Sequence, residues 1–300
     1  MTNRISLTAG DYRLELLPEA GGAIGALAWR HPERGWIDLM RPTPAGSIRP
    51  KPVETACFPL VPFANRIRDG RFTFRGRTVQ FPASPIGKHY LHGTAWLHPW
   101  SEDEGVNSAT EFAWLKYRHE PDAWPYAFET SQHFWFNSNG LNIELSTTNK
   151  SAEPMPFGFG LHPYFPRTPL CRLEADVSGW WECDDEVMPA KLTGVRPDID
   201  PRTGLAIASV VCDNAFTGWK GPAKITWPER RTSLTMTTTP QMGVLFLYVP
   251  PGLDHFCVEP NSHFADAFNL VSAGRTDTGL IVLEPGQSAG AVITFKAAVA

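Results

Sequence analysis

The chain has 300 residues, of which 42% are hydrophobic and 19% charged, and its formal net charge at pH 7 is −4. This composition provides enough apolar side chains for a sizeable core, and it excludes a disordered acidic tail. It also excludes a protein that binds nucleic acid through bulk positive charge. The longest apolar run, residues 244–251, has the length of a strand and not of a bilayer-spanning helix. We therefore expect neither nucleic acid nor a membrane as a partner.

The cysteines and the first ten residues indicate a reducing compartment. The number of cysteines is odd, and none form a Cys-x-x-Cys pair, so the spacing predicts neither a disulfide framework nor a zinc knuckle. Residues 1–10 lack the apolar core of a secretory leader. We expect a cytoplasmic protein with mostly buried, inert thiols. The cysteines are Cys57, Cys171, Cys183, Cys212 and Cys257.

Turn residues and alternating apolar residues predict strands along the whole chain. The 25 glycines and 28 prolines leave little room for long helices, whereas strands of about five or six residues fit between them. Residues 128–136 alternate, Asn139-Gly140 is a strong hairpin signal, and residues 141–145 alternate again. A second hairpin is predicted around Gly76. Further strands are predicted at 232–238, 244–249, 280–283 and 292–295.

No linker or change in composition divides the chain, so we expect one domain over residues 1–300. Many strands with turn signals between them indicate an all-β sandwich or a barrel-like sandwich.

Two residues are candidates for acid/base chemistry. His162 lies in GFGLHPYF (158–165), where stiff and bulky neighbours would hold a positioned acid or base. Glu259 ends the apolar run FCVEP (256–260), where partial desolvation raises a carboxyl pKa toward the range of a general base. Either residue alone is better explained as structural. An acid/base pair requires the fold to bring the two segments together.

Other motifs give weaker indications of a functional site. His89 and His92, in KHYLHG (88–93), have no evident third and fourth ligand, so we expect no metal site. The chain has no Gly-x-Ser-x-Gly elbow, phosphate loop or dinucleotide fingerprint, and we expect no cofactor. Five arginines lie between residues 66 and 77, and most should cover a solvated hairpin. Arg66 differs because it follows the apolar stretch 58–64 and Asn65, so its guanidinium is a candidate for a pocket.

Four segments of the chain resemble the aldose 1-epimerases, the galactose-mutarotase-like proteins, and they occur in that family's order. They are PFANRIRDGR (62–71), LHG (91–93), LHPYF (161–165) and VEP (258–260). The resemblance implies a large antiparallel β-sandwich with few short helices and a sugar cleft on one open sheet face. It also implies cofactor-free interconversion of the α and β anomers of a free aldose. The implied partner is a monosaccharide, and the protein would be a monomer or a homodimer.

The resemblance also implies roles for individual residues. His162 is similar to the family's general acid and Glu259 to its general base. His92 is similar to the second active-site histidine, and Arg66 to the arginine that lines the pocket. Asp213, in VCDN (211–214), is similar in position to the carboxylate that holds sugar hydroxyls. Asp184 and Asp185 compete for that last role.

Two departures bear on which sugar is bound. Many family members have Asn where this chain has Gly160, and Gly where it has Thr94; we expect both positions to face the sugar.

Three alternatives for the function stay open. The substrate could carry an anionic group at C6, as the arginine cluster and Lys88 suggest. The chain could be a non-catalytic sugar-binding module. Glu259 and Asp213 could also imitate the two carboxylates of a glycosidase.

Overall fold

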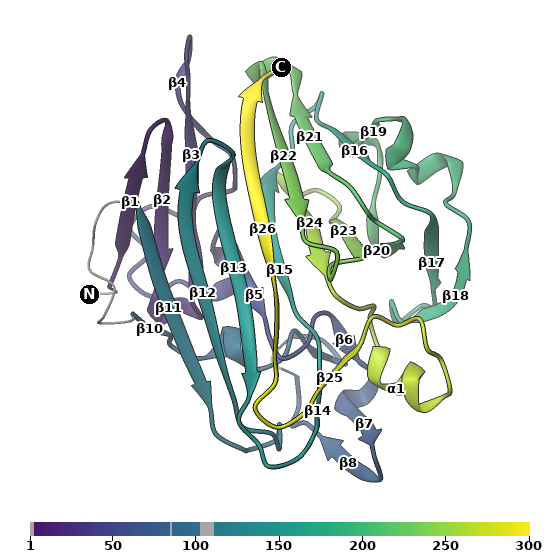
Figure 1. Cartoon of the computed structure of the whole chain (residues 1–300). Helices are drawn as coiled ribbons and strands as arrows, with labels where there is room; N and C mark the ends of the chain where they lie inside the picture. The colour runs from purple at the N-terminus through teal and green to yellow at the C-terminus, as the bar shows by residue number, and fades with distance from the viewer. Residues whose placement is uncertain (1–2, 85, 103–110) are drawn as a thin grey trace.

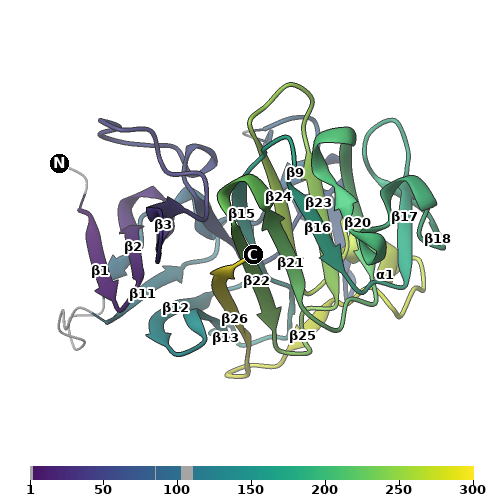
Figure 2. The same cartoon turned by 90° about the horizontal axis from the view of Figure 1, so that it is seen from above.

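The computed structural model of the chain describes residues 3–84, 86–102 and 111–300. Two large antiparallel sheets, of 11 and 9 strands, make up most of it (Figure 1). Seen from above, the sheets lie as two layers, one against the other (Figure 2). The all-β class predicted from the sequence is confirmed. No helix among the described residues is long and apolar enough to span a membrane.

The 11-stranded sheet has the order β1-β2-β3-β5-β15-β24-β23-β20-β17-β18, with β4 paired to β3. Its strands are β1 (Ile5–Ala9), β2 (Tyr12–Leu17), β3 (Ala23–His31), β4 (Gly35–Asp38), β5 (Cys57–Leu60), β15 (Gly160–Pro166), β17 (Gly179–Cys183), β18 (Pro189–Thr193), β20 (Cys212–Thr217), β23 (Val244–Val249) and β24 (His255–Asn261).

The 9-stranded sheet has the order β10-β11-β12-β13-β26-β22-β21-β16-β19. Its strands are β10 (Ser101–Glu102), β11 (Phe112–His119), β12 (Phe128–Asn137), β13 (Gly140–Asn149), β16 (Arg172–Ala175), β19 (Leu205–Ala206), β21 (Ala223–Trp227), β22 (Thr232–Thr238) and β26 (Ser288–Val299). Three small pairs join β6 (Arg66–Ile67) to β9 (Tyr90–Leu91), β7 (Arg71–Phe74) to β8 (Arg77–Gln80), and β14 (Met155–Phe157) to β25 (Ile281–Leu283).

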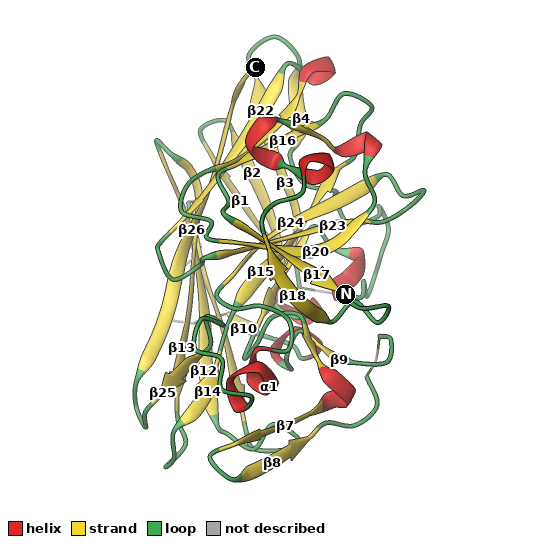
Figure 3. Cartoon of the chain, turned by 90° about the vertical axis from the view of Figure 1, so that its right-hand side faces the viewer, coloured by secondary structure: helices red, strands yellow, loops and turns green. Residues whose placement is uncertain are grey.

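Helices are short in the described part of the chain. The α-helix α1 (Ala267–Ser272) packs beside β7, and Ser272 Oγ donates to the Thr73 carbonyl at 2.7 Å. A side view shows α1 and the β7–β8 hairpin at the same end of the molecule (Figure 3). The 3₁₀ turns are Pro18–Ala20, Pro52–Glu54, Arg68–Gly70, Ala95–Leu97, Pro197–Ile199, Pro201–Thr203, Ile207–Ser209 and Pro228–Arg230.

The predicted hairpins are confirmed, with one small shift. β12 and β13 pair from Phe128 with Asn149 to Asn137 with Gly140. Ser138 and Asn139 are therefore the two turn residues, and Gly140, with φ of 99°, already begins the next strand. In the β7–β8 hairpin, Arg75 and Gly76 form the turn with positive φ, as an I′ turn requires.

The main core lies between the two sheets. Successive side chains of a strand point to opposite faces, so one set from each strand packs inward. Phe165, Phe256 and Val258 of the 11-stranded sheet belong to the same buried cluster as Leu141 and Ile143 of the other sheet. This shared core supports the single domain that we propose. The alternate residues of β15 and β24 face away from the core, and the functional candidates are among them.

Candidate active site

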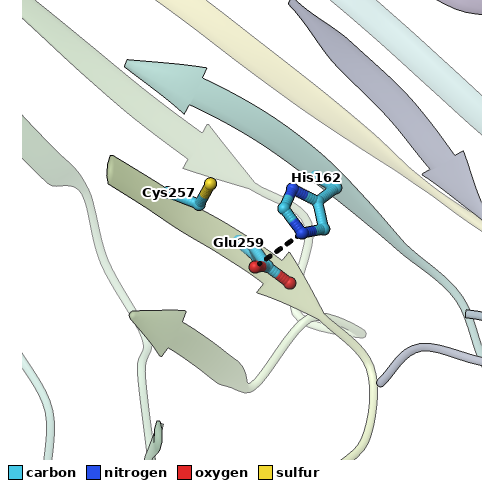
Figure 4. A group of neighbouring side chains, drawn as sticks. All are labelled: His162, Cys257 and Glu259. Carbon is cyan, nitrogen blue, oxygen red and sulfur yellow. Dashed lines mark ion pairs between the residues drawn. The ribbon is translucent and has the colours of Figure 1, made fainter. Parts of the chain in front are cut away.

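His162 and Glu259 lie opposite each other on neighbouring strands. β15 and β24 run antiparallel, and the register that pairs Gly160 with Asn261 and Tyr164 with Cys257 places His162 across from Glu259. The Nε2 atom of His162 is 3.3 Å from Oε1 of Glu259 (Figure 4). The two segments that the sequence could not connect are therefore brought together by a strand pair.

Both groups of this pair are withdrawn from water. His162 is 7% exposed and Glu259 is 1% exposed. Burial lowers the pKa of His162 to about 3. Burial also raises the pKa of Glu259 well above its usual value, and the nearby carboxylate of Asp213 adds to the rise. Burial in this site therefore favours a neutral carboxyl beside a neutral imidazole. This matches the raised carboxyl pKa expected from the sequence.

Two atoms of the pair have no hydrogen-bond partner among the described residues. They are Nδ1 of His162 and Oε2 of Glu259. Buried polar atoms are normally paired, so unpaired ones beside a cavity mark where a polar ligand gains most from binding.

Two loops place His92 next to the pair. The backbone N–H of His92 donates to the Asn65 carbonyl at 2.9 Å, and the Asn65 N–H donates to Nδ1 of His92 at 3.1 Å. Because Nδ1 accepts, the neutral imidazole carries its proton on Nε2. Burial lowers the pKa of His92 well below its usual value, and its ring lies 5.2 Å from that of His162. His92 is thus a neutral hydrogen-bond donor in the site.

Arg66 and Asp213 form a planar ion pair at the other side of the site. Nη2 of Arg66 lies 2.9 Å from Oδ2 of Asp213, and Nη1 lies 3.4 Å from Oδ1. Asn65 orients the arginine, because its Oδ1 accepts from the backbone N–H of Arg66 at 2.9 Å. The bidentate geometry fixes both charges while their outer atoms stay available to a ligand.

These residues surround one cavity of about 510 Å³. Its floor is formed by adjacent strands of the 11-stranded sheet, on the face turned away from the main core. All five residues expected from the sequence line it: Arg66, His92, His162, Asp213 and Glu259. The volume and the mixture of rings and polar groups suit a small polar ligand.

Comparison with known proteins agrees with this architecture. The aldose 1-epimerase family model matches residues 3–296. This chain belongs to the aldose 1-epimerase family. YphB of Escherichia coli K12, a protein of uncharacterised function, is 32% identical over 300 residues, which cover 97% of each chain.

Two solved structures share the fold. A candidate aldose 1-epimerase of Escherichia coli K12 matches with a TM-score of 0.87 and 31% identity over the whole of both chains. A galactose mutarotase-like protein of Clostridium acetobutylicum matches with a TM-score of 0.87 and 19% identity, over 100% of this chain and 96% of that one. The second likeness shows the fold alone.

Within this family member, Asp184 does not compete with Asp213 for the cavity. Oδ2 of Asp184 lies 2.7 Å from Nη2 of Arg68, on a partly exposed surface, and Asp185 is exposed. Neither of them lines the cavity.

The arginine cluster also stays outside the cavity, apart from Arg66. Arg68 is paired as above, Arg75 lies 3.6 Å from Glu284, and Arg77 pairs with Glu153. Lys88 pairs with Glu186. These carboxylates neutralise four of the charges that suggested an anionic substrate, those of Arg68, Arg75, Arg77 and Lys88.

Gly160 and Thr94, the two departures from the family pattern, do not line this cavity. A Cβ at Gly160 would lie 1.9 Å from Oδ1 of Asn261, so the Asn261 side chain fills the space that a larger residue would need. Thr94 is buried, and its backbone N–H donates to the Val61 carbonyl at 3.0 Å.

Three side chains of the site could offer donor atoms to a metal ion. His162, Cys257 and Glu259 each offer one atom, and these atoms lie within 4.8 Å of one another (Figure 4). Zinc lies about 2.0–2.3 Å from each of its ligand atoms. Ligand atoms around one zinc ion are therefore closer to one another than 4.8 Å. Burial raises the pKa of the Cys257 thiol and of the Glu259 carboxyl, so an ion would have to displace both protons. The group fits proton transfer better than metal binding.

Several lining residues were missed by sequence reasoning. Tyr164 follows His162 by two positions on the same strand face, so alternation could have identified it. Arg41 has no local signal, because only the fold stacks its guanidinium 3.9 Å from the Tyr164 ring centre and 3.4 Å from the nitrogens of His255. Other missed lining residues are Phe58, Phe246 and Tyr248.

Proposed function

We propose that this protein is an aldose 1-epimerase that interconverts the α and β anomers of a free aldose. The observation that carries the proposal is the buried His162–Glu259 contact of 3.3 Å inside a cavity of about 510 Å³. Anomer exchange needs one group to remove a proton from the C1 hydroxyl and another to protonate the ring oxygen. A facing carboxyl and imidazole supply both groups.

The pair holds one proton that it can exchange. This proton belongs to Glu259 before the reaction, because burial raises its pKa and lowers that of His162. The resemblance of His162 to the family's general acid implies that it starts protonated, and its lowered pKa is opposite in direction. Transfer of the proton to Nε2 of His162 produces the carboxylate base and the imidazolium acid, so the two groups titrate as a coupled pair.

The reaction then consists of proton transfers alone. Glu259 removes the proton of the C1 hydroxyl while His162 protonates the ring oxygen. The bond between C1 and the ring oxygen breaks, and a free aldehyde forms. Rotation about C1–C2 presents the other face of the aldehyde. Ring closure with the two roles reversed returns both protons and yields the other anomer.

The remaining polar residues hold the sugar in place. Nε2 of His92 is a donor for the developing aldehyde oxygen, because Nδ1 is engaged by Asn65. The Arg66–Asp213 pair offers donors and acceptors to neighbouring hydroxyls. Fixed orientation of this kind lowers the entropic part of the barrier.

The alternatives have less support. A non-catalytic binder would gain nothing from a desolvated acid and base, which cost stability. A glycosidase requires two carboxylates that act on the scissile bond, whereas Asp213 is engaged by Arg66. The charges of Arg68, Arg75 and Arg77, which suggested a C6 anion, are neutralised outside the cavity.

The test is anomer exchange measured by polarimetry or magnetisation-transfer NMR. Pure α anomers of glucose, galactose, arabinose and xylose are dissolved with and without the protein, and faster relaxation is expected for at least one. The His92→Asn variant should retain part of the rate. A loss as large as that of His162→Gln would move the acid role to His92. No acceleration with any of these sugars would contradict the proposal for neutral aldoses.

A further inference from the structure

A second cavity, of about 590 Å³, lies beside the proposed catalytic cavity and shares Arg41 with it. Its lining contains an unusual number of arginines around one partly exposed indole. These residues are Arg34, Arg41, Arg167, Arg230 and Trp36. The proposed reaction uses none of these five side chains, although Arg41 also lines the catalytic cavity.

The four guanidinium groups are held by backbone carbonyls. Arg34 donates to the Glu229 carbonyl at 3.0 Å, and Arg230 donates to the Asp38 carbonyl at 3.3 Å. Arg167 donates to the Pro250 carbonyl at 2.7 Å, and Arg41 to the Val53 carbonyl at 2.8 Å. A carbonyl fixes the direction of a guanidinium and leaves its full charge in place.

Several arginines elsewhere in the protein are neutralised. Arg66, Arg68 and Arg77 each have a carboxylate partner. Among the residues that the structure describes, none of the four cavity arginines forms such an ion pair. These four guanidinium groups therefore keep a positive charge that an anion from outside the chain can neutralise.

The charge in the lining sets the class of that partner. Asp38 and Asp254 are the acidic side chains in the lining. Asp254 is 91% exposed, and its Oδ1 lies 3.1 Å from Nδ1 of His255. Four arginines against two aspartates leave an excess of two positive charges. A phosphate monoester carries about −1.5 to −2 charges at neutral pH, and planar guanidinium groups match its oxygens.

Trp36 adds a surface for the organic part of such a ligand. Its side chain is 37% exposed, and the Arg13 guanidinium lies 3.9 Å from the ring centre. The rest of the indole borders the cavity, so a ring or a carbon chain attached to the phosphate can pack against it.

We propose that this arginine-lined cavity is a second binding site, separate from the catalytic cavity, for a small phosphate monoester. The phosphate lies against Arg34 and Arg230, and the organic part lies against Trp36. Because Arg41 borders both cavities, the bound ester lies next to the proposed sugar site.

The test is calorimetric titration of the full chain with phenyl phosphate, inorganic phosphate and phenol. Phenyl phosphate should bind best, inorganic phosphate more weakly, and phenol least. Loss of one charge-assisted hydrogen bond is worth about tenfold in affinity. Arg34→Gln and Arg230→Gln should therefore each weaken phenyl phosphate binding about tenfold. The indole N–H signal of Trp36 should shift in the NMR spectrum on titration.

Matched variants decide between the cavities. In Arg172→Gln the lost arginine also donates to a backbone carbonyl, that of Gly204 at 3.0 Å, but lies outside the cavity, so binding should not change. The proposal is overturned if phenyl phosphate does not saturate the protein, or if Arg34→Gln and Arg230→Gln bind it normally. Binding that is lost in Arg66→Gln alone would place the anion in the catalytic cavity. Binding is measured without turnover, so the result is independent of the epimerase assay.

Discussion

The carboxyl of Glu259 and the imidazole of His162 are buried on the outer face of one sheet, and burial moves both pKa values toward the neutral forms. In water these groups would carry opposite charges at neutral pH. Inside the cavity they lie 3.3 Å apart, and we propose that they exchange a single proton. A shared proton can be given and taken back within one catalytic cycle without help from solvent.

Removal of either partner should therefore abolish anomer exchange and leave the fold intact. For His162→Gln and Glu259→Gln we expect losses of about 10²- to 10⁴-fold in kcat, the usual contribution of one proton-transfer group. Polarimetry of the purified variants measures this. Glu174→Gln, an exposed strand glutamate, is the matched control and should keep full activity. Near-normal turnover by Glu259→Gln would remove its assignment as the base.

The pH profile of kcat/KM should be unusually broad on the acid side. The active pair carries one proton, and a second proton is added to His162 only near its pKa of about 3. The alkaline limb follows loss of the proton from Glu259, whose pKa lies well above 4.5. No acid limb should therefore appear near pH 6.5, where an ordinary imidazole titrates. The spontaneous rate is subtracted at each pH, and an acid limb near 6.5 would contradict this assignment.

At the scale of elements, two loop residues, Asn65 and His92, lie beside the acid/base pair. The strands β15 and β24 hold that pair. Asn65 and His92 adopt positive φ of 59° and 64°, and they hydrogen-bond to each other through backbone and ring. Gly93 follows with φ of 72° and packs against the Val61 carbonyl. The conformation of the loops, more than their composition, places His92 beside His162.

Gly93→Ala should therefore damage both stability and activity. Its Cβ would lie 2.3 Å from the Val61 carbonyl oxygen, in addition to the strain of positive φ. Gly252→Ala is the matched control, because Gly252 has φ of 71° with no atom within 4 Å of the added Cβ. The backbone term alone costs about 1–2 kcal/mol in each case. Thermal unfolding should show a larger loss for Gly93→Ala, and polarimetry should show lost activity there alone. Equal effects would remove the role of this contact.

At the scale of the whole molecule, the site costs stability because it requires an ionisable group in a dry place. Between its unfolded pKa near 4.5 and its raised folded pKa, Glu259 keeps a proton in the folded chain that the unfolded chain has lost. The unfolded state then binds fewer protons. The free energy of unfolding consequently falls with rising pH in this window, by up to about 1.4 kcal/mol per pH unit from this group.

Glu259→Gln should remove that slope. The difference in unfolding free energy between the variant and the natural protein should grow in favour of the variant above pH 4.5, and it should level off above the folded pKa. His162 has a lowered pKa and the opposite slope between about 3 and 6.5. Because the two groups are coupled, the same comparison is also made in a His162→Gln background, which removes that contribution. Urea unfolding at several pH values measures the difference. A difference that does not vary with pH would contradict the raised pKa.

The sequence by itself determined the all-β class, the hairpins near Asn139-Gly140 and around Gly76, and four of the five expected cavity residues: Arg66, His92, His162 and Glu259. Alternation and turn residues are local signals, and the four motifs keep their order along the chain, so both can be detected without a structure. The tertiary structure decided what depends on distance. Asp213 lines the cavity and Asp184 does not. Arg68 and Arg77 pair with surface carboxylates. The tertiary structure also brought Arg41 to Tyr164, a contact between distant segments that no local pattern encodes. Burial reversed the expected protonation of His162, because desolvation depends on everything packed around a group and not on its neighbours in sequence.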